Sequence, residues 1–370
     1  MATISDVARL AGVSPSTVSR TCSDHPSISR QTKEKVRRAM VQLGYEPNFQ
    51  ATSLATQNSR TFGILLPPLE YEAYQKNFYL EAIRGIGLFC NQKQYTNTIL
   101  TGQSDEELLQ SVQSMVKSGR VEGFILLYAR EDDPILAYLQ AEGVLYVLIG
   151  QSKKDLEDTI YVNNDNIQAC RELTSMLIEM GHRRIAYISD EWQHNYAQDR
   201  KSGYLLAMTE HQLPIRPEYI LESSGLPEEN DGKLTALFSL PQRPTAIVAS
   251  DDVLAMALER VVLSLGLRIP QDLSIAAFND SLFSRLACPQ LTSVNINAQQ
   301  LGIEAASQII NHIENPDLLA AKIIVPHRII PRARARARAR RGRAGRRAVA
   351  LCRGLRAELV AGLRGKRGGA

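Results

Sequence analysis

Short hydroxyl side chains and one arginine stand close together near the N-terminus. Ser16, Thr17 and Arg20 would share the outer face of a helix that starts at Pro15. A guanidinium can donate two hydrogen bonds to O6 and N7 of guanine, and a Ser or Thr hydroxyl can serve a base edge or a phosphate. These three residues therefore have the chemistry to read the major groove of double-stranded DNA.

Two short helices around a tight turn would position these side chains. Thr3 is the expected N-cap of the first helix, with Asp6 as its capping-box partner. The apolar face of this helix has four expected members: Val7, Ala8, Leu10 and Ala11. Gly12 lets the chain turn, Ser14 is the expected N-cap of the second helix, and Pro15 suits its first position.

A third helix is predicted to begin after Ser29 and to end at Gly44. Three helices can close a small core, and its expected members are Val7, Val18, Val36 and Leu43. The segment 45–55 contains Pro47 and predicts one more short helix with nothing of its own to pack on. A helix pair with a glycine turn also occurs in proteins that do not bind DNA. The third helix and the trailing segment favour a DNA-binding headpiece followed by a hinge.

Four motifs carry a resemblance to a known family. They are DVARLAGVS at 6–14, STVSR at 16–20, TKEKV at 32–36 and GYEPN at 44–48. On these motifs, residues 1 to about 332 resemble repressors of the lactose/galactose repressor (LacI/GalR) family. The resemblance implies a hinge helix that becomes ordered only on operator DNA and pairs with its copy from a second subunit.

The resemblance also assigns roles to hinge residues. Leu54 matches the leucine that the family inserts into the minor groove, where an apolar wedge unstacks a base step and bends the duplex. Thr21 and Cys22 stand where the family usually has aliphatic residues, and Thr52 stands where it often has Arg. The residues that we expect to contact DNA are Thr3, Ser14, Pro15, Ser16, Thr17, Arg20, Asn48, Ala51, Leu54 and Ala55.

Charge is divided unevenly along the chain, although the formal net charge is only +4. Residues 1–60 hold 8 Lys and Arg against 4 Asp and Glu, a net of +4. Residues 61–331 hold 21 against 34, a net of −13. A basic headpiece attracts phosphates, and an acidic body keeps the rest of the chain from binding DNA indiscriminately.

The C-terminal residues 332–370 form a basic low-complexity tail, with 14 Lys and Arg against the single acid Glu358. One interpretation is a natural basic arm for nucleic acid. The abrupt change of composition after Pro331 favours a second interpretation, a frameshift, read-through or cloning scar. Under either interpretation we expect the tail to be disordered.

The body alternates strands with helices, which predicts an α/β fold with parallel sheets. Strands are expected at 62–66, 123–128, 145–150, 184–189, 246–250 and 273–278, and helices at 79–92 and 165–180. The pattern restarts near residue 165, so two halves are expected. The predicted fold class is an N-terminal all-α helix-turn-helix headpiece plus an α/β periplasmic-binding-protein-like body of two Rossmann-like subdomains.

The expected domain boundaries follow from this division. Residues 1–45 are the DNA-binding domain, and 46–60 are the hinge helix and linker. The N-subdomain is expected to contain 61–161 with 292–321, and the C-subdomain 162–291 with 322–331, followed by the tail.

Polar and aromatic side chains come directly after several predicted strands. Ligands of open α/β sheets bind beyond the carboxyl ends of the strands, so we expect these side chains to line a cleft between the two halves. Carboxylates, amides and one arginine among aromatic rings suit the hydroxyls and C–H faces of a sugar. The expected effector-binding residues are Tyr74, Gln75, Tyr128, Asp165, Trp192, Arg200, Ser250, Asp251, Asn279 and Asp280.

The family resemblance implies specific roles for some of them. Arg200, which is expected to lie where residues 199–204 open a helix, matches the arginine that grips the effector. Ser250 and Asp251 match an Asn-Asp pair, and Asn279 and Asp280 match an Asp-Asp pair. Serine has a shorter reach than asparagine, so the ligand need not resemble a galactoside.

Three of the candidates have a structural alternative. Asp165 and Asp251 can be N-caps of the helices that follow them. Trp192, the only tryptophan, can be an ordinary packing residue.

Three segments narrow the resemblance further. YQKNFY at 74–79, LYAREDDP at 127–134 and VNNDNIQA at 162–169 are most similar to the maltose-operon repressors of Gram-positive bacteria. This similarity implies an α-glucoside effector such as maltose or a maltodextrin. A purine effector is less favoured, because nothing in the sequence identifies a purine clamp.

An enzyme is not expected. Asp132 with Asp133, and Asp251 with Asp252, could suggest a glycosidase, but adjacent residues point apart on a strand and their separation across a cleft cannot be inferred from sequence. The six histidines show no metal-ligand spacing, so neither a metal nor a cofactor is expected.

The five cysteines are isolated along the chain, which fits a reduced cytoplasm without disulfides. The N-terminus has no apolar signal region, and no segment is long and apolar enough to span a bilayer. We therefore expect a cytoplasmic protein with no membrane partner. An exported sugar-binding protein without regulatory DNA binding is the alternative, and the headpiece argues against it.

The predicted function is repression of sugar-utilisation genes by a homodimer that reads a palindromic operator. A sugar that prefers one state of the clamshell would separate the hinge helices and lower operator affinity. For Gram-positive relatives the resemblance also allows a phosphocarrier corepressor, although no residue of the sequence identifies a surface for it.

Overall fold

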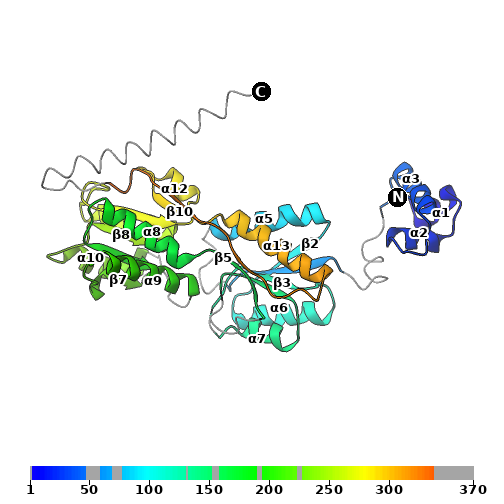
Figure 1. Ribbon diagram of the computed structural model, residues 1–370, viewed down its shortest axis with the longest axis horizontal. Coiled ribbons are helices and arrows are strands. Elements are labelled where there is room, and N and C mark those ends of the chain that lie inside the picture. The colour runs from blue at the N-terminus through cyan, green and yellow to red at the C-terminus, as the bar shows by residue number, and fades with distance from the viewer. Residues whose placement is uncertain are drawn as a thin grey trace, which may run out of the picture.

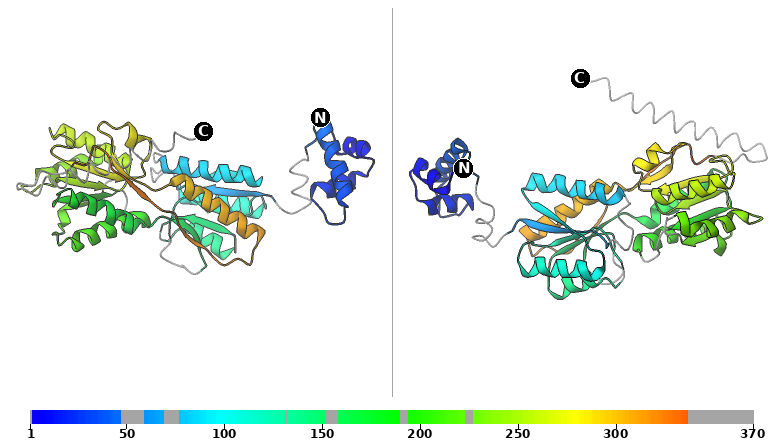
Figure 2. Two further views of the ribbon diagram at one scale, coloured as in Figure 1. Left: turned by 45° about the horizontal axis from the view of Figure 1, so that its top comes forward. Right: turned by 180° about the vertical axis from the view of Figure 1, so that it is seen from behind.

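The computed structural model describes residues 2–46, 59–68, 77–130, 132–151, 158–189, 194–222 and 227–336. These residues form a three-helix headpiece and a body of two lobes (Figures 1 and 2). The headpiece contains α1 (Ile4–Ala11), α2 (Pro15–Cys22) and α3 (Arg30–Leu43).

Helix ends in the headpiece follow the local signals of the sequence. The Thr3 hydroxyl accepts from the Asp6 backbone N–H, and the Asp6 carboxylate accepts from the Thr3 backbone N–H at 3.0 Å, so the predicted capping box is confirmed. Ser14 caps α2 ahead of Pro15, and Ser29 caps α3. The predicted starts of all three helices are confirmed, and so are the predicted ends of α1 at Gly12 and of α3 at Gly44.

The headpiece core contains Val7, Ala8, Ala11, Val18, Val36 and Ala39. Two predictions about this core are wrong: Leu10 is 45% exposed and Leu43 is 36% exposed. A helix of eight residues buries only one narrow face. In α1 this face is occupied by Val7, Ala8 and Ala11, and Leu10 lies beside it. Helix α3 has 14 residues, so its last turn, with Leu43, extends past the two eight-residue helices.

The first lobe is built on a six-stranded parallel sheet in the order β11-β5-β4-β3-β1-β2. Its strands are β1 (Thr61–Leu65), β2 (Thr96–Leu100), β3 (Phe124–Leu126), β4 (Tyr146–Ile149), β5 (Ile160–Asn163) and β11 (Lys322–Ile324). Helices α5 (Asn77–Lys93) and α13 (Ala298–Glu314) cover one face, and α6 (Asp105–Lys117) and α7 (Pro134–Ala141) cover the other.

The second lobe repeats this plan in the order β12-β10-β9-β8-β6-β7, with only the edge strand β12 antiparallel. Its strands are β6 (Ile185–Ser189), β7 (Ile220–Glu222), β8 (Ala246–Ala249), β9 (Ser274–Phe278), β10 (Thr292–Asn295) and β12 (Arg328–Ile330). Helices α8 (Asn166–Glu179) and α9 (Asn195–Glu210) pack on one face, and α10 (Pro227–Ser239) and α11 (Asp252–Ser264) on the other. The short η3 (Pro217–Tyr219) precedes β7, and α12 (Leu282–Leu286) precedes β10. The predicted fold class is confirmed.

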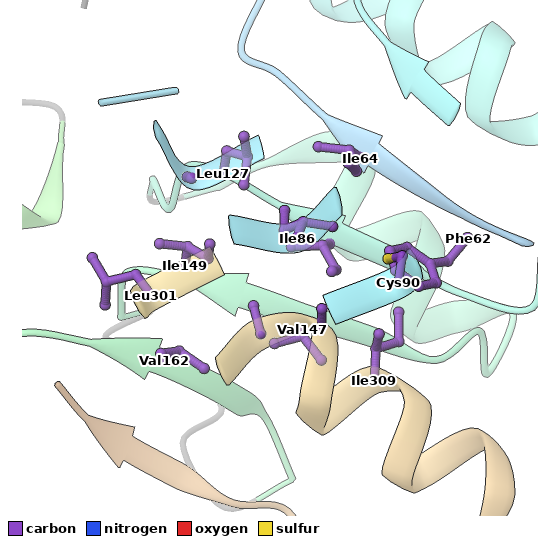
Figure 3. Close-up of a cluster of buried hydrophobic side chains, with 14 of the residues drawn as sticks. Phe62, Ile64, Ile86, Cys90, Leu127, Val147, Ile149, Val162, Leu301 and Ile309 are labelled. Carbon is purple, nitrogen blue, oxygen red and sulfur yellow. The ribbon is translucent and has the colours of Figure 1, made fainter. Parts of the chain in front are cut away.

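In each lobe, two helices pack closely against each other at a glycine. Figure 3 shows the buried cluster between α5, α13 and the first sheet. A Cβ atom on Gly85 of α5 would lie 2.0 Å from the carbonyl oxygen of Gln299 on α13. In the second lobe, a Cβ atom on Gly203 of α9 would lie 2.1 Å from the carbonyl oxygen of Ile167 on α8. These contacts leave room for hydrogen only, and they set how closely the helices can pack.

The chain crosses between the lobes three times, at slightly different points from those expected. Strand β10 pairs with β9 in the second sheet, and β11 pairs with β5 in the first. Residues 292–295 therefore belong to the second lobe, and 322–324 to the first, because strand pairing and not position along the chain decides membership. The Asn164 side chain lies at the first crossing and donates to the carbonyls of Ile296 at 3.0 Å and Val325 at 2.8 Å, which lie at the other two.

The folded body extends beyond the expected boundary at Pro331. The Arg332 N–H donates to Thr292 Oγ1 at 2.9 Å, and the Arg336 N–H donates to Ser274 Oγ at 3.1 Å. Arg334 is fully buried and donates from Nη2 to both carboxylate oxygens of Glu259 at 2.9 Å. We call residues 331–336 the C-terminal strap. Residues 337–370 of the predicted tail lie outside the described part of the chain.

Candidate functional site

The first candidate site is the outer face of α2 in the headpiece. Ser16 and Arg20 are exposed, Thr17 is half-buried, and Val18 points into the core. The Ser14 hydroxyl caps the helix by accepting from the Thr17 backbone N–H at 3.2 Å, and it also contacts the Ser16 and Thr17 hydroxyls. Helix α2 thus presents two hydroxyls and one guanidinium to solvent. Its N-cap and its core residue Val18 fix the orientation of the helix.

The guanidinium of Arg20 makes no hydrogen bond or ion pair with another described residue. Its five N–H donors are therefore available to an external acceptor such as guanine or phosphate. The predicted hinge contacts Asn48, Ala51, Leu54 and Ala55 lie outside the described residues.

The second candidate site is a cavity of about 700 Å³, including its opening to solvent, between the two lobes. Both lobes and the crossings contribute to its lining, which consists of Phe78, Tyr79, Leu127, Tyr128, Ala129, Ile149, Gly150, Gln151, Asn163, Asn164, Asn166, His194, Asn195, Tyr196, Arg200, Asp251, Asn279, Ile296 and Leu301. Most of these residues lie at the carboxyl ends of strands in the two sheets or in the helices that follow those strands. This is where ligands of open α/β sheets are expected to bind.

Arg200 is the cation of this cavity. It is 4% exposed, and it donates from Nε to Asn166 Oδ1 at 2.8 Å and from Nη1 to the Ser250 carbonyl at 2.6 Å. Its guanidinium lies 4.1 Å from the ring centroid of Phe278 and 4.9 Å from that of Tyr196. No described carboxylate pairs with it. These contacts hold Arg200 in place. Three of its five N–H donors stay unused, so it can still bind hydroxyl oxygens.

Amide side chains line the same cavity, and one of them, Asn166, contacts this cation. Asn166 donates to Asn163 Oδ1 at 3.2 Å while it accepts from Arg200. Asn195, at the start of α9, donates to the Gln151 carbonyl of the other lobe at 2.7 Å. An amide both donates and accepts, and a sugar hydroxyl needs partners of both kinds.

Aromatic and aliphatic side chains form the facing wall. Phe78 packs against the cores of both lobes, and its ring meets that of Tyr79 edge to face with centroids 5.3 Å apart. Tyr128 is buried, and its burial together with the neighbouring Asp133 raises the pKa of its hydroxyl well above the ordinary value. This wall therefore offers neutral, apolar surface.

Backbone contacts hold the two walls together. Arg130 of the first lobe and His194 of the second form an isolated antiparallel bridge. Burial opposes the charge of Arg130, but its ion pairs with Asp105 and with Asp133, the latter at 2.8 Å, outweigh this and raise its pKa. The bridge and the Asn195–Gln151 bond show that the structure is the state in which the lobes touch across the cavity.

The structure gathers four of the predicted effector residues in the cavity: Tyr128, Arg200, Asp251 and Asn279. Asp251 also caps α11 by accepting from the Leu254 N–H at 2.8 Å, so the structural alternative and cavity lining both apply to it. Whether these residues contact an effector stays a prediction.

Three predicted residues do not line the cavity. Ser250 is buried, and its backbone carbonyl accepts from Arg200. Asp165 caps α8 by accepting from the Gln168 N–H at 2.8 Å. Asp280 pairs with Arg332 of the C-terminal strap. Tyr74, Gln75 and Trp192 lie outside the described residues.

Other lining residues were not anticipated from the sequence. Asn163 is the last residue of β5 and Asn164 directly follows it, so the rule that found Asn279 would have found them had that strand been predicted. Asn195 and Tyr196 were missed because α9 begins at Asn195 and not near Asp199. The N-cap of α9 is His194, which makes no side-chain capping bond, so the sequence contains no start signal for this helix.

Metal-ligand clusters and membrane-spanning helices are both absent from the described part of the chain. No three His, Cys, Asp or Glu side chains come together there as metal ligands would. None of the described helices combines the length and the apolar character needed to cross a membrane.

Comparison with known proteins matches both parts of the chain. Residues 3–48 match the family model for bacterial regulatory proteins of the lacI family, and residues 174–333 match a periplasmic binding protein-like domain. The chain is 35% identical over 332 residues to the HTH-type transcriptional regulator MalR of Staphylococcus xylosus, covering 90% of this chain and 97% of that protein.

Solved structures give the same result. The probable maltose operon transcriptional repressor malR of Staphylococcus aureus is 28% identical with a TM-score of 0.70, covering 76% of this chain and 99% of that one. The transcriptional regulator CelR in complex with cellobiose is 27% identical with a TM-score of 0.70, covering 90% of this chain and 100% of that one. The resemblance inferred from the motifs is confirmed. The chain belongs to the lacI family of bacterial regulatory proteins and is a DNA-binding transcriptional repressor.

Proposed function

We propose that this repressor controls sugar-utilisation genes and that an α-glucoside such as maltose releases it from a palindromic operator. The observation that carries the effector class is the cavity, in which one unpaired buried arginine and several amides face an aromatic wall. Such a lining suits a neutral polyol with one apolar face, and among the described lining residues only Asp251 offers a carboxylate to a cationic ligand.

The choice of an α-glucoside rests on the relatives. Proteins named as maltose regulators are similar to this chain over most of its length. The CelR–cellobiose complex is also similar, which makes a β-linked disaccharide the alternative to be tested.

The position of the cavity supports release by a population shift. A ligand between the lobes contacts both, so it binds the touching state better than a separated one and shifts the lobes toward it. To clear an occupied operator, the ligand must favour its state by roughly several kcal/mol. One bond would not suffice, and the several donors and acceptors around Arg200 fit this requirement.

Operator reading is proposed to require a homodimer, because two headpieces at a fixed spacing read two half-sites. Exposed apolar side chains suit burial against a second copy. On α12, Leu282 is 55% exposed, Phe283 47% and Leu286 71%. A phosphocarrier corepressor stays a prediction, tested by adding that protein to the operator assay.

The test begins with selection of bound sequences from random DNA duplexes, followed by a mobility-shift assay with maltose, cellobiose or glucose. We expect a palindromic site and release by maltose. Release by cellobiose alone would refute the α-linkage, and no response to any sugar would refute the sugar effector. Failure to bind any duplex at low salt would contradict DNA binding itself.

The headpiece variant Arg20→Ala should relax base preference at one position of each half-site, at a cost of about 1–3 kcal/mol. Arg9→Ala is the matched control, because Arg9 is an exposed arginine of α1 that pairs with Asp6. Leu54→Ala should weaken specific binding more than non-specific binding, as the hinge prediction requires.

A further inference from the structure

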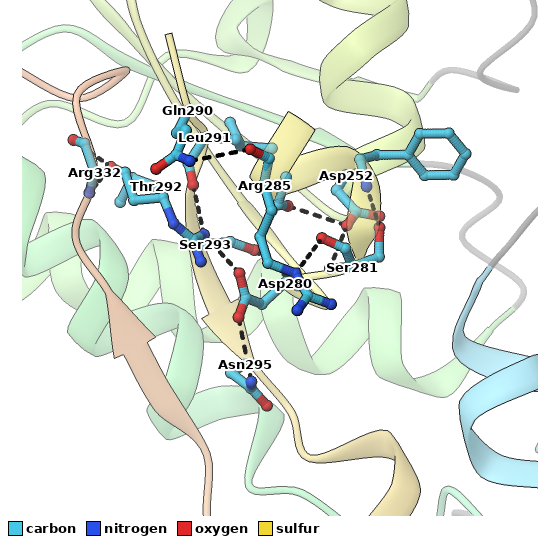
Figure 4. A network of polar contacts seen from close by, with 12 residues as sticks. Asp252, Asp280, Ser281, Arg285, Gln290, Leu291, Thr292, Ser293, Asn295 and Arg332 are labelled. Atoms are coloured by element: carbon cyan, nitrogen blue, oxygen red, sulfur yellow. Dashed lines mark hydrogen bonds and ion pairs between the residues drawn. The ribbon is translucent and has the colours of Figure 1, made fainter. Parts of the chain in front are cut away.

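An ion pair joins the C-terminal strap to the edge of the effector cavity. Arg332 Nη1 lies 2.5 Å from Asp280 Oδ1 and donates to the Leu291 carbonyl at 2.9 Å. Both side chains are largely buried, with 13% of Arg332 and 9% of Asp280 exposed. Figure 4 shows this pair at the end of β10, with Asp280 between Arg332 and Asn295.

Besides its ion pair with Arg332, Asp280 makes two hydrogen bonds to residues of β10. Its Oδ2 accepts from Asn295 Nδ2 at 3.2 Å, and its backbone N–H donates to Ser293 Oγ at 3.0 Å. Its two carboxylate oxygens are thereby shared between β10 and the strap. This is why Asp280 does not line the cavity, whereas its neighbour Asn279 does.

The backbone at this point is in a conformation that needs support. Asn279 has φ 85° and Asp280 has φ 50°, so two consecutive residues other than glycine are left-handed. Asn and Asp adopt this conformation more readily than other non-glycine residues, but two in succession still need surroundings that hold them. The bonds that hold this turn converge on Asp280, and Arg332 supplies the only cation among them in the described structure.

We infer that Arg332 is a positioning residue for effector binding. Acting through Asp280, it keeps the left-handed turn that presents Asn279 to the cavity, without touching the effector itself. The inference rests on the proposed function, since it concerns the same sugar cavity. It gives the first part of the basic tail a role in ligand affinity that neither interpretation of the tail anticipated.

The strap contains a comparator for this role. Arg334 is also a buried arginine paired with an acid, Glu259 on α11, but no described contact links it to the cavity. If the strap only stabilised the second lobe, Arg332→Ala and Arg334→Ala would act alike. If Arg332 positions Asn279, only its removal changes the turn and the affinity.

Two measurements on the full chain separate these outcomes. The first is hydrogen–deuterium exchange at the amides of residues 279–281, which needs no sugar. We expect faster exchange there in Arg332→Ala and unchanged exchange in Arg334→Ala. The second is calorimetric titration with maltose, where Arg332→Ala should bind about fivefold more weakly, the value of one lost neutral hydrogen bond from Asn279. Arg334→Ala should stay within about twofold of the wild type, and both should keep operator affinity without sugar.

Arg332→Gln serves if Arg332→Ala fails to fold, because glutamine keeps part of the aliphatic stem but carries no positive charge to pair with Asp280. Exchange at 279–281 that is equal in the Arg332 and Arg334 variants would overturn the inference, as would equal losses of maltose affinity. A wild-type chain that binds no sugar would contradict the proposed function, and the exchange result would still decide whether Arg332 holds the turn.

Discussion

The two lobes have the same construction but give different surfaces to the cavity between them. Each has a six-stranded sheet with two helices on each face, and each brings one helix pair together at a glycine. The first lobe contributes mainly apolar and aromatic lining, such as Phe78, Tyr79 and Tyr128. The second contributes mainly hydrogen-bonding groups, such as Asn166 and Arg200.

This difference shows that two lobes of the same fold can contribute different kinds of groups to one binding site. The core of each lobe depends on burial and close helix packing, and it does not determine which groups follow the strands. We call the first lobe the aromatic lobe and the second the polar lobe. We expect the polar lobe to control which ligand binds and the aromatic lobe to add affinity with less discrimination between ligands. The following predictions test that division in order of expected effect.

The largest effect is expected for Arg200→Ala. It removes the buried cation of the polar lobe, and hydrogen bonds from a charged donor are worth about 1.5–3 kcal/mol each. Maltose affinity should fall about a hundredfold or more, and sugar should no longer release the operator. Calorimetry and the mobility-shift assay measure the two effects. Arg171→Ala is the control and should bind maltose normally, because Arg171 is a partly exposed arginine of α8 that pairs with Glu210 on α9.

The second prediction concerns stability and treats the lobes as equals. Gly85→Ala and Gly203→Ala each place a Cβ against a backbone carbonyl, so each should lower the free energy of unfolding by about 1–3 kcal/mol. Gly87→Ala is the control, because a Cβ there meets nothing within 4 Å and alanine favours the helix. Urea denaturation of the three variants checks this. A harmless Gly203→Ala would mean that the lobes are not packed alike.

The third prediction tests the aromatic lobe. Phe78→Ala removes a ring that packs against both cores but no hydrogen-bonding group. Affinities for maltose and for cellobiose should both fall, by about tenfold, so their ratio should hardly change. Phe89→Ala on the same helix is the control, since Phe89 does not line the cavity. A changed ratio would refute the division between affinity and discrimination.

The smallest effect is expected for Asn195→Ala, which removes the bond to the Gln151 carbonyl across the cavity. A neutral hydrogen bond contributes about 1 kcal/mol, so maltose affinity should fall about fivefold with the free energy of unfolding nearly unchanged. Small-angle scattering without sugar should show a more open body than the wild type. No change in either measurement would mean that this bond does not hold the lobes together.

Local signals in the sequence predicted local structure well. Thr3, Ser14, Ser29 and Asp165 cap the helices that they were expected to cap, because a cap depends on a few neighbouring residues. Six of the buried strands were recognised by their apolar runs, whereas β5 and β10 were not predicted. Asn279 was found because it directly follows a strand, and residues that follow parallel strands share one edge of the sheet. Arg200 was singled out by the family resemblance.

Long-range pairings could not be predicted in this way. Asp280 was expected in the cavity, and its partner Arg332 lies 52 residues later in a segment whose composition suggested disorder. The lobe boundaries were displaced because the pairing of β10 and β11 depends on the whole sheet. The exposure of Leu43 depends on how far α3 extends past its neighbours.

The bonds of Asn164 have a mechanical consequence. Because one amide fastens the first crossing to the other two, the three connections cannot shift separately. Any swing of one lobe against the other must turn about an axis close to this residue, with atoms near it moving least and the outer ends of the lobes moving most. A distance label placed at each outer end would therefore amplify a small rotation at the centre.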